Sequence, residues 1–282
     1  MYTISGNTIM INDPELLRDI FIKDFHVFPD HINNIYFGSS HMSKGLFFLK
    51  GGDDWKRIRN IITPAFTSGK LRSMMGPISD ITNRLVDMLV KYERTDSEKS
   101  DKDFGYDSIS DDDPNDPTTG QTPTTKIPVG KLTTDEIVAQ STQFFLAGYD
   151  TSSAALSNAI YYLSEHKDCQ QKLFDELDGC GDLSVESVLQ LKYLNGVVNE
   201  TLRLAPSFVQ LFRTCVKDYK LGHTGITLPA DTDVLISPYA IQRDPEYWPN
   251  PDAFIPERFI DPKHHPYAYV TFGAGPRLGT RV

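Results

Sequence analysis

The sequence predicts a mainly α-helical protein with a small β-sheet. One long segment, Thr133 to Glu165, reads as a single helix. Residues 77–92 repeat apolar side chains at helical spacing, which predicts a second long helix. Short strand-like segments lie at residues 2–11, with a possible turn at residues 5–7. Others lie after Arg203, at residues 209–216, 219–221 and 234–237, between Gly, Pro and Asp turns. Because these segments come from both ends of the chain, we expect them to share one sheet in a single domain.

The segment 133–165 has a clear helix start and an unusual distribution of apolar residues. Thr133 followed by Glu136 is a capping box, and Asp135 places negative charge on the first turn, where the helix dipole favours it. The apolar side chains that follow spread around the helix instead of forming one stripe. A helix that is apolar on most sides is buried, so we expect this one in the middle of a large domain.

The centre of this helix contains a glycine followed by a carboxylate and a hydroxyl. Gly148 costs roughly 1 kcal/mol relative to alanine, and polar groups such as Asp150 and Thr151 need partners when they are buried. One interpretation is that the missing side chain at Gly148 lets a small ligand approach the helix backbone. The carboxyl of Asp150 and the hydroxyl of Thr151 could then supply protons to that ligand. The other is a helix-packing notch in which Thr151 bonds back to carbonyls of its own helix. Taken alone, the segment favours the packing notch.

Composition and charge argue against several classes of protein. The chain has 282 residues and a formal net charge of −10, whereas nucleic-acid binding requires a basic face. Cys169, Cys180 and Cys215 show neither C-x-x-C spacing nor a nearby His pair, so we expect no zinc site. No run approaches the roughly 18 apolar residues of a membrane span, and no leader opens the chain. The chain as written is therefore expected to lack a membrane anchor.

From residue 93 to residue 130 the chain is rich in Asp, Ser, Thr, Pro and Gly. A segment of this composition buries too little apolar surface to offset the entropy cost of ordering it. We expect a disordered acidic linker here, with a binding tail as the alternative. It would separate an N-terminal part, residues 1–92, from a C-terminal part, residues 131–282.

Three short motifs outside the long helix combine charged and aromatic residues. Trp55 and Arg59 lie four residues apart on a predicted helix, an arrangement most often used for stacking at the surface. Glu200 and Arg203 are an i, i+3 pair, usually a surface ion pair worth about 0.2–0.5 kcal/mol. Residues 256–259, Pro-Glu-Arg-Phe, would fit an ordinary turn. Each motif alone is more typical of structure than of function.

Taken together and in this order, the motifs resemble those of the cytochrome P-450 family of heme-thiolate monooxygenases. W-x-x-x-R resembles the family's C-helix, A-G-x-D-T its oxygen-binding I-helix and E-x-x-R its K-helix. The segments WKRIR and PAFTSGKLRSM are similar in sequence to members of the animal microsomal clan that holds the family-3 drug oxidisers and thromboxane synthase. The residues that carry the resemblance are Trp55, Arg59, Ala147, Gly148, Asp150, Thr151, Glu200, Arg203, Pro256 to Phe259, Phe272, Gly275 and Arg277.

The resemblance implies a cytochrome P-450-like fold that binds heme b. Asp150 and Thr151 would be the catalytic residues that relay protons to dioxygen, and Ala147 and Gly148 would leave a groove for it. By the resemblance, Trp55, Arg59, Arg213 and Arg277 would hold the heme propionates, because planar guanidinium groups bind carboxylates through two hydrogen bonds. The implied cofactor-binding residues are Trp55, Arg59, Ala147, Gly148, Arg213, Phe272, Gly275 and Arg277, and Glu200, Arg203 and Arg258 would form a buried ion network.

The chain departs from the family pattern in ways that make the expected fold incomplete. The acidic linker stands where the family has its E to H helices, and the family's L-helix region is absent. The family's heme loop continues R-x-C-x-G, whereas Arg277-Leu278 is followed at once by Gly279, so the axial cysteine thiolate is missing. We therefore assign no metal ligand. His264 and His265 are the nearest nitrogen ligands in sequence, but a pair in a Pro-flanked coil is usually solvated.

By the resemblance, the protein inserts one oxygen atom of O₂ into a small apolar substrate, with NADPH-derived electrons from an NADPH–cytochrome reductase. A basic patch of Lys56, Arg57, Lys70 and Arg72 could meet that reductase, or could be only a solvated face. The alternative is a cysteine-less pseudoenzyme or mis-spliced fragment without monooxygenase activity. The family resemblance implies the endoplasmic reticulum membrane, whereas the chain as written would be cytosolic.

Overall fold

The computed structural model describes residues 2–3, 6–31, 41–66, 68–96, 131–181 and 184–277. The chain divides into two compact units, the first made of Met1–Pro64 and Gly130–Val282 and the second of Ala65–Val129. The first unit contains strands from both ends of the chain, and it also contains the site described below. The three-part division expected at residues 1–92, 93–130 and 131–282 stays a prediction.

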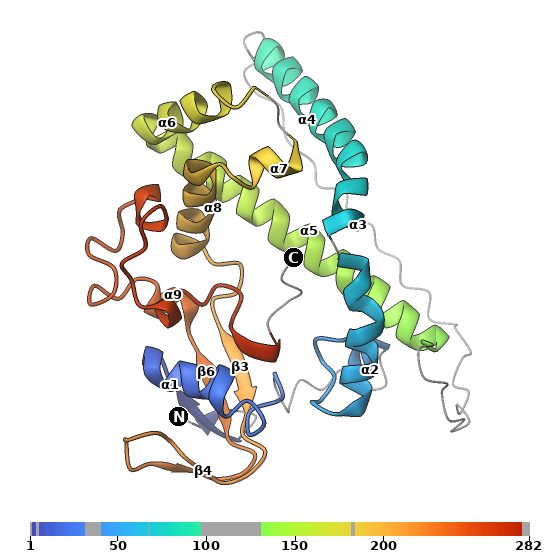
Figure 1. The fold of residues 1–282 in the computed structure, drawn as a ribbon, viewed down its shortest axis with the longest axis vertical. Helices are drawn as coiled ribbons and strands as arrows, with labels where there is room; N and C mark the ends of the chain where they lie inside the picture. The colour runs from blue at the N-terminus through green and yellow to red at the C-terminus, as the bar shows by residue number, and fades with distance from the viewer. Residues whose placement is uncertain are drawn as a thin grey trace. The chain divides into compact units, whose positions relative to one another are not determined.

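A four-stranded sheet in the first unit joins the two ends of the chain (Figure 1). Strand β2 (Gly6–Met10) runs parallel to β6 (Asp233–Ile236), which pairs antiparallel with β3 (Leu211–Thr214). Strand β1 (Tyr2–Thr3) pairs antiparallel with β2, so the two strands form a hairpin at the possible turn expected near residues 5–7. The predicted sheet of N-terminal and later strands is confirmed.

A second, two-stranded sheet pairs β4 (Tyr219–Lys220) with β5 (Thr227–Leu228). The sequence predicted a strand at the first position but none at the second. Both strands are two residues long, too short for the period-two alternation that identifies a strand in sequence.

The core beside the larger sheet is supplied by the helical segment that follows β2. Helix α1 (Pro14–Arg18) is capped by Asp13, whose side chain accepts from Leu16 N at 2.9 Å, and it continues into the π-helix η1 (Asp19–Lys23). Fully burying a large apolar side chain contributes about 1.5–3 kcal/mol. The residues with the least exposure in this core include Leu17, Ile20, Phe21, Phe28, Val234, Ile236, Ile241 and Trp248.

The first four described α-helices after the expected linker lie next to one another in the sequence. They are α5 (Thr134–Glu165), α6 (Lys167–Asp178), α7 (Val185–Val188) and α8 (Lys192–Leu204). Helices α6 and α8 pack together, and each also contacts α5 (Figure 1). Their shared apolar cluster comprises Cys169, Leu173, Tyr193, Val197, Leu204 and Phe254.

The buried ion network predicted on α8 is confirmed. Arg203 Nε donates to Glu200 Oε2 at 2.7 Å, and Arg258 Nε lies 3.3 Å from Glu200 Oε1. Arg203 and Glu200 are both 0% exposed. The remaining Arg203 nitrogens donate to Glu200 Oε1 and to three backbone carbonyls, so all five N–H groups of this guanidinium have partners. The three acceptors belong to Gln242, Pro251 and Ala253.

The expected burial of the long helix is wrong. Only Glu136, Ala139 and Gln140, near its N-terminus, are buried. Phe145 is 71% exposed and Leu156 63%. Apolar side chains show which faces of a helix could pack against another segment. They do not show that such a segment is present in the chain.

The second unit contains helices α3 (Ser68–Ser73) and α4 (Met75–Asp96). The helix predicted for residues 77–92 is therefore present and is longer at both ends. Its last residues, 93–96, belong to the segment that the sequence assigned to the linker. The rest of that segment, residues 97–130, lies outside the described residues.

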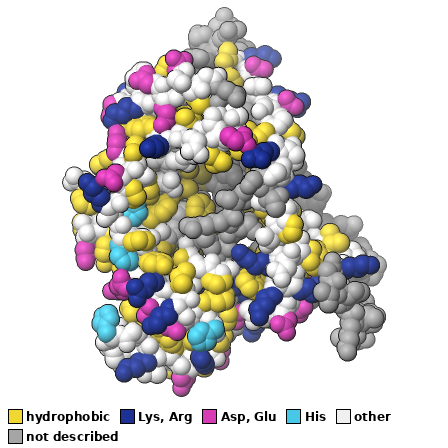
Figure 2. Space-filling model, in the orientation of Figure 1, with side chains coloured by type: hydrophobic (Ala, Val, Ile, Leu, Met, Phe, Trp, Pro, Cys, Tyr) yellow, Lys and Arg dark blue, Asp and Glu magenta, His cyan; other side chains and the backbone are white. Residues whose placement is uncertain are grey.

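Helix α2 and several short helical turns make up much of the remaining described chain. They are η2 (His41–Lys44), α2 (Asp53–Ile62), η3 (Thr63–Phe66), α9 (Pro238–Ile241), η4 (Pro256–Phe259), η5 (Pro266–Ala268) and η6 (Gly275–Arg277). On the face shown in Figure 2, hydrophobic side chains reach the surface among charged side chains of both signs. Across the described segments, no helix is both long and apolar enough to span a bilayer.

Candidate functional site

Two adjoining cavities in the first unit lie against α5. One has a volume of about 520 Å³ and a mainly apolar lining, and the other, of about 300 Å³, is lined by arginines and aromatic rings. Both are within the range of small-molecule sites. The residues that line both cavities are Phe47, Gln143, Ala147 and Phe208.

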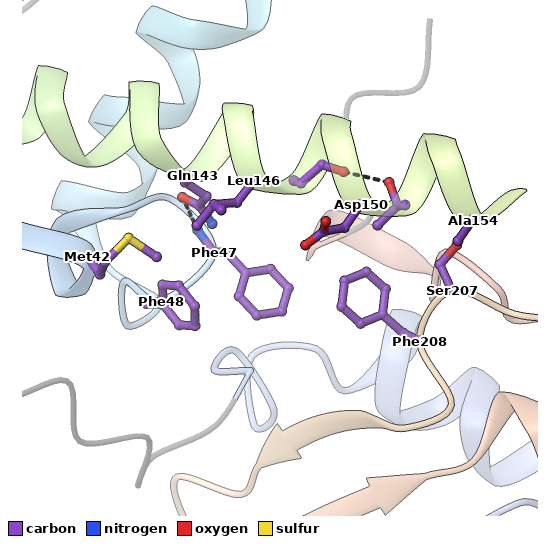
Figure 3. A pocket seen from close by; sticks show the side chains of 11 residues that line it. Met42, Phe47, Phe48, Gln143, Leu146, Asp150, Ala154, Ser207 and Phe208 are labelled. Atoms are coloured by element: carbon purple, nitrogen blue, oxygen red, sulfur yellow. Dashed lines mark hydrogen bonds between the residues drawn. The ribbon is translucent and has the colours of Figure 1, made fainter. Parts of the chain in front are cut away.

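The apolar cavity is bounded by a single face of α5. Residues separated by three or four positions lie on the same face of a helix. Figure 3 shows the Asp150 carboxylate and the rings of Phe47 and Phe208 facing this cavity. The α5 residues that line it follow that spacing: Gln143, Leu146, Ala147, Asp150, Thr151 and Ala154.

The opposite wall comes from residues 41–48, which hydrogen bonds hold against α5. Leu46 N donates to Gln140 Oε1 at 2.9 Å, and Gln140 Nε2 donates to Lys44 O at 2.8 Å. Phe47 N donates to Gln143 Oε1 at 3.3 Å (Figure 3). Polar side chains of α5 therefore fix the segment that carries Phe47, the ring shared by both cavities.

A largely buried ion pair joins α2 to the start of α5. Arg57 binds the Glu136 carboxylate and also lies 3.3 Å from Asp54 Oδ1. Burial raises the pKa of Glu136, but hydrogen bonds from Arg57 and from Thr133 N outweigh it and leave the pKa below its ordinary value. Arg57 therefore has an intramolecular role, and its inclusion in an exposed basic patch is corrected.

The second cavity brings together most of the residues predicted to bind a cofactor. Trp55 and Arg59 are adjacent on one face of α2, with the guanidinium carbon 5.2 Å from the indole centroid. Burial lowers the pKa of Arg59. The predicted residues that line this cavity are Trp55, Arg59, Ala147, Arg213, Phe272 and Arg277. Gly148 and Gly275 are absent from this lining.

Arg277 is held in place by backbone carbonyls from the N-terminal part of the chain. Its Nε donates to Pro29 O at 2.6 Å, and its Nη2 donates to Leu49 O at 2.8 Å. Nη2 also lies 3.6 Å from Asp30 Oδ1, and the guanidinium lies over the Trp55 ring. Burial lowers the pKa of Arg277 to about 10 despite the attraction of Asp30.

Arg213 is buried without a neutralising carboxylate among the described residues. Its Nη1 donates to Phe212 O at 2.7 Å and lies 2.9 Å from His31 Nδ1, and its Nε has no hydrogen-bond partner in the described part of the chain. Burial, followed by repulsion from Arg277, lowers its pKa to about 9. A buried cation without a counter-charge is costly, which points to an anionic ligand.

Tight backbone packing holds the loop that carries Arg277. Gly273 and Gly275 have φ values of 72° and 75°, in the region that favours glycine. A Cβ on Gly275 would lie 1.9 Å from Phe21 O. Gly275 therefore acts through packing in this structure, whereas Phe272, 68% exposed, lines the cavity itself.

The central motif of α5 combines features of both sequence interpretations. Thr151 Oγ1 donates to Ala147 O at 2.5 Å, as the packing interpretation expects. A Cβ on Gly148, however, would meet no heavy atom within 4 Å, so packing does not require glycine there. Asp150 and Thr151 both line the apolar cavity, in a position where a small ligand could reach them.

The lining residues that sequence reasoning missed include His31, Phe47, Gln143 and Phe208. Gln143 could have been found, since it lies four and eight residues before Ala147 and Thr151 on one helix face. The other three lie in irregular segments, where no periodicity indicates which side chains converge.

Comparison with known proteins agrees with this geometry. The cytochrome P450 family model matches residues 1–110 and 93–279. This chain belongs to the cytochrome P450 family. It is 30% identical to cytochrome P450 3A9 of Rattus norvegicus, with 95% of this chain and 71% of the relative covered. It is 29% identical to cytochrome P450 3A5 of Homo sapiens, with 95% of this chain and 71% of the relative covered. It is 28% identical to cytochrome P450 6B2 of Helicoverpa armigera, with 98% of this chain and 73% of the relative covered.

These alignments are longer than the chain itself. The alignment with the rat P450 spans 367 residues, whereas this chain has 282, so at least 85 aligned positions (367 less 282) have no counterpart here. The two pieces matched by the family model meet at residues 93–110. The rat relative therefore contains aligned positions that this chain lacks.

Membership of the family makes the chain, by class, a heme-thiolate monooxygenase, and heme iron the implied cofactor. The described residues fit the carboxylate side of a heme. Arg213 and Arg277 are buried cations beside a cavity with aromatic and aliphatic walls, and the Arg213 Nε has an open hydrogen-bonding position. Two carboxylates would supply the negative charge that the cavity lacks.

The described residues do not supply a thiolate to this cavity. None of the three cysteines lines it. Cys215 Sγ donates to Lys217 O at 2.7 Å, and burial raises the pKa of this thiol, as it does that of Cys169. No cluster of three or more His, Cys, Asp or Glu side chains suited to a metal ion occurs in the described segments. Residues 278–282, where the family cysteine would be expected, lie outside them.

The two histidines near this loop are partly buried and make side-chain contacts, whereas the sequence suggested solvated side chains. His264 stacks on Trp248 with ring centroids 4.3 Å apart, and burial lowers its pKa. His265 Nε2 lies 3.1 Å from Glu15 Oε1. Neither lines the arginine cavity, so both have structural contacts outside it.

Proposed function

We propose that this chain inserts one oxygen atom of O₂ into a small apolar organic substrate, with electrons derived from NADPH. The reaction consumes substrate, O₂, NADPH and one proton, and it yields hydroxylated product, water and NADP⁺. The observation that carries this proposal is the pair of adjoining cavities along α5, one lined by arginines and one mainly apolar.

Each cavity supports a different part of the reaction. Arg59, Arg213 and Arg277 would bind the carboxylates of heme b, which supplies one-electron and O₂ chemistry when bound. Phe47 and Phe208, which line both cavities, would exclude water from the substrate.

The α5 side chains would handle protons. Asp150 would hold a proton at its carboxylate, at the edge of the apolar cavity. The Thr151 hydroxyl both donates and accepts, so it could pass that proton on after turning away from Ala147 O. Gly148 would leave room for dioxygen, because the space beside its Cα is open.

Electron delivery and location are proposed from the similarity to mammalian relatives. An NADPH–cytochrome reductase would be the electron donor, and Lys56, which is exposed, could contribute to its docking. We place the protein at the endoplasmic reticulum membrane. The 1–92 and 131–282 parts would together form the heme domain.

Isotope labelling tests the proposed reaction. The heme-loaded protein, a reductase and NADPH are incubated under ¹⁸O₂ with a small apolar substrate, and the product is analysed by mass spectrometry. We expect one ¹⁸O atom per product and loss of product formation without NADPH. A Ser152→Ala variant, altered on the exposed side of α5, should behave like the parent, whereas Thr151→Ala should give less product per NADPH.

A second candidate rests on the absence of a cysteine from the cavity lining. In this alternative the chain binds heme without a thiolate and has no monooxygenase activity. The two candidates differ in the spectrum of the reduced carbon-monoxide adduct, since only a thiolate gives the red-shifted Soret band of the family. The unaltered chain should lack that band if the second candidate is right. Its presence would make Cys215 the first residue to mutate.

A further inference from the structure

His31 occupies an unusual position for a titratable side chain. It lines the arginine cavity, and its ring stacks on Phe47 with centroids 4.4 Å apart. Its Nδ1 lies 2.9 Å from Arg213 Nη1. No sequence motif marks this residue, and the roles assigned above to the arginines do not use it.

The hydrogen bond to Arg213 fixes the protonation state of His31. A guanidinium has donors only, so His31 Nδ1 must accept, and the ring proton must be on Nε2. The imidazole is therefore neutral. Burial, followed by repulsion from Arg213 and Arg277, lowers the pKa of His31 to about 2.

The charges around His31 are unbalanced. Arg213 of β3 and Arg277 of η6 share its cavity. The neighbouring carboxylate is Asp30, which is engaged by Arg277 and by Gly51 N. Among the described residues, two arginines thus face one carboxylate that already has partners. A ligand with two carboxylates would reverse this balance, because opposite charges nearby favour the protonated form of an imidazole.

Resting on the proposed function, we propose that His31 is a fourth anion-binding side chain of this cavity and takes up one proton when a dicarboxylate porphyrin binds. Arg213 Nη1 turns from His31 to a carboxylate oxygen. This movement frees the lone pair on Nδ1, which accepts a proton from solvent. The imidazolium then offers N–H donors from both nitrogens, where the neutral ring offers one.

Proton uptake makes binding depend on pH in a defined direction. The pKa of His31 is far below neutral in the free protein and rises in the complex, so the complex gains affinity as pH falls. If the pKa in the complex reaches the ordinary value of about 6.5, affinity increases about tenfold between about pH 7.5 and about pH 5.5. Arg213 and Arg277 stay protonated throughout this range and take up nothing.

Calorimetry measures the proposed proton uptake directly. Iron protoporphyrin IX is titrated into the full chain near pH 6 in two buffers of different ionisation enthalpy, and the difference in heat gives the protons taken up per ligand. At a pKa in the complex of about 6.5, we expect uptake of about three quarters of a proton for the parent chain. Uptake should be close to zero for His31→Gln, whose amide retains hydrogen bonding but does not titrate. His223→Gln, altered at an exposed histidine outside the cavity, should match the parent.

A second ligand distinguishes the effect of the porphyrin carboxylates on proton uptake from the effect of the porphyrin ring. The dimethyl ester of the same porphyrin carries no negative charge at these positions, so it should bind without proton uptake. Porphyrin binding without uptake, or uptake retained in His31→Gln, would overturn the role of His31 and leave the proposed function standing. Failure of the chain to bind either porphyrin at any pH would overturn both.

Discussion

At the scale of single residues, the chain contains two kinds of buried arginine. Arg203 has all five N–H groups paired and a carboxylate partner in Glu200. Arg213 has no carboxylate partner, and its Nε has no acceptor among the described residues. The first arrangement stabilises the fold, whereas the second stores a positive charge that a ligand can neutralise.

Removal of Arg203 should destabilise the protein strongly. Arg203→Ala leaves the Glu200 carboxylate buried without its main partner, which should lower the free energy of unfolding by about 3–5 kcal/mol. The control is Arg18→Ala, which breaks an exposed pair with Glu15 and should cost less than about 1 kcal/mol. Urea denaturation of both variants gives the comparison, and similar losses would show that the Arg203 pair behaves as a surface pair.

The sequence predicted these residues unequally. Glu200 and Arg203 could be found because the E-x-x-R spacing places both on one helix face. Arg213 was assigned only through the family resemblance, and His31 was not found at all. Its position depends on how an irregular segment folds back onto β3, and local sequence carries no signal for such a contact.

At the scale of elements, α5 shows what periodicity can and cannot predict. The capping box at its start and the stripe from Gln143 to Ala154 follow from residue spacing. The burial of α5 does not follow from residue spacing, because it depends on which other segments of the chain pack against the helix. At least 85 aligned positions of the rat relative have no counterpart here, and most of α5 is exposed.

The attachment of α5 to α2 should weaken in acid. The pKa of Glu136 is below its ordinary value of 4.5, so its contribution to stability is present in full above that pH and is lost as pH falls through the folded-state pKa. Glu136→Gln removes the charge at every pH and should cost about 1–3 kcal/mol near neutral pH.

Unfolding measurements across pH provide the test. The difference in free energy of unfolding between the parent chain and Glu136→Gln should shrink as pH falls below 4.5. Glu186→Gln, on the short helix α7 away from this ion pair, is the matched control. A difference that stays constant over this range would contradict the ionic role of Glu136.

At the scale of the whole molecule, the first unit is built from segments far apart in the sequence. Strand β2 pairs with β6, and Arg57 of α2 binds Glu136 of α5. The sequence predicted the shared sheet because strand signals occur at both ends. It could not predict which side chains bridge the two segments, since that depends on register and packing.

Cleavage between the two segments should not separate them. A specific protease site inserted after Ser110, within residues 93–130, allows the chain to be cut at one place. We expect both fragments to elute together from a sizing column in native buffer, because sheet pairing and the Arg57–Glu136 contact join them. Elution as two independently folded fragments would show that the chain contains two separate domains.

The affinity of Arg213→Met for iron protoporphyrin IX tests the proposed heme site most directly. The apolar side chain removes a buried, uncompensated charge, so the free protein should be as stable as the parent or more stable. Loss of a hydrogen bond to a charged group, worth about 1.5–3 kcal/mol, should weaken porphyrin binding by roughly tenfold to a hundredfold. Binding of the porphyrin dimethyl ester should be unchanged. Equal affinities of parent and variant for the free acid, or equal losses for acid and ester, would contradict a carboxylate-binding role for Arg213.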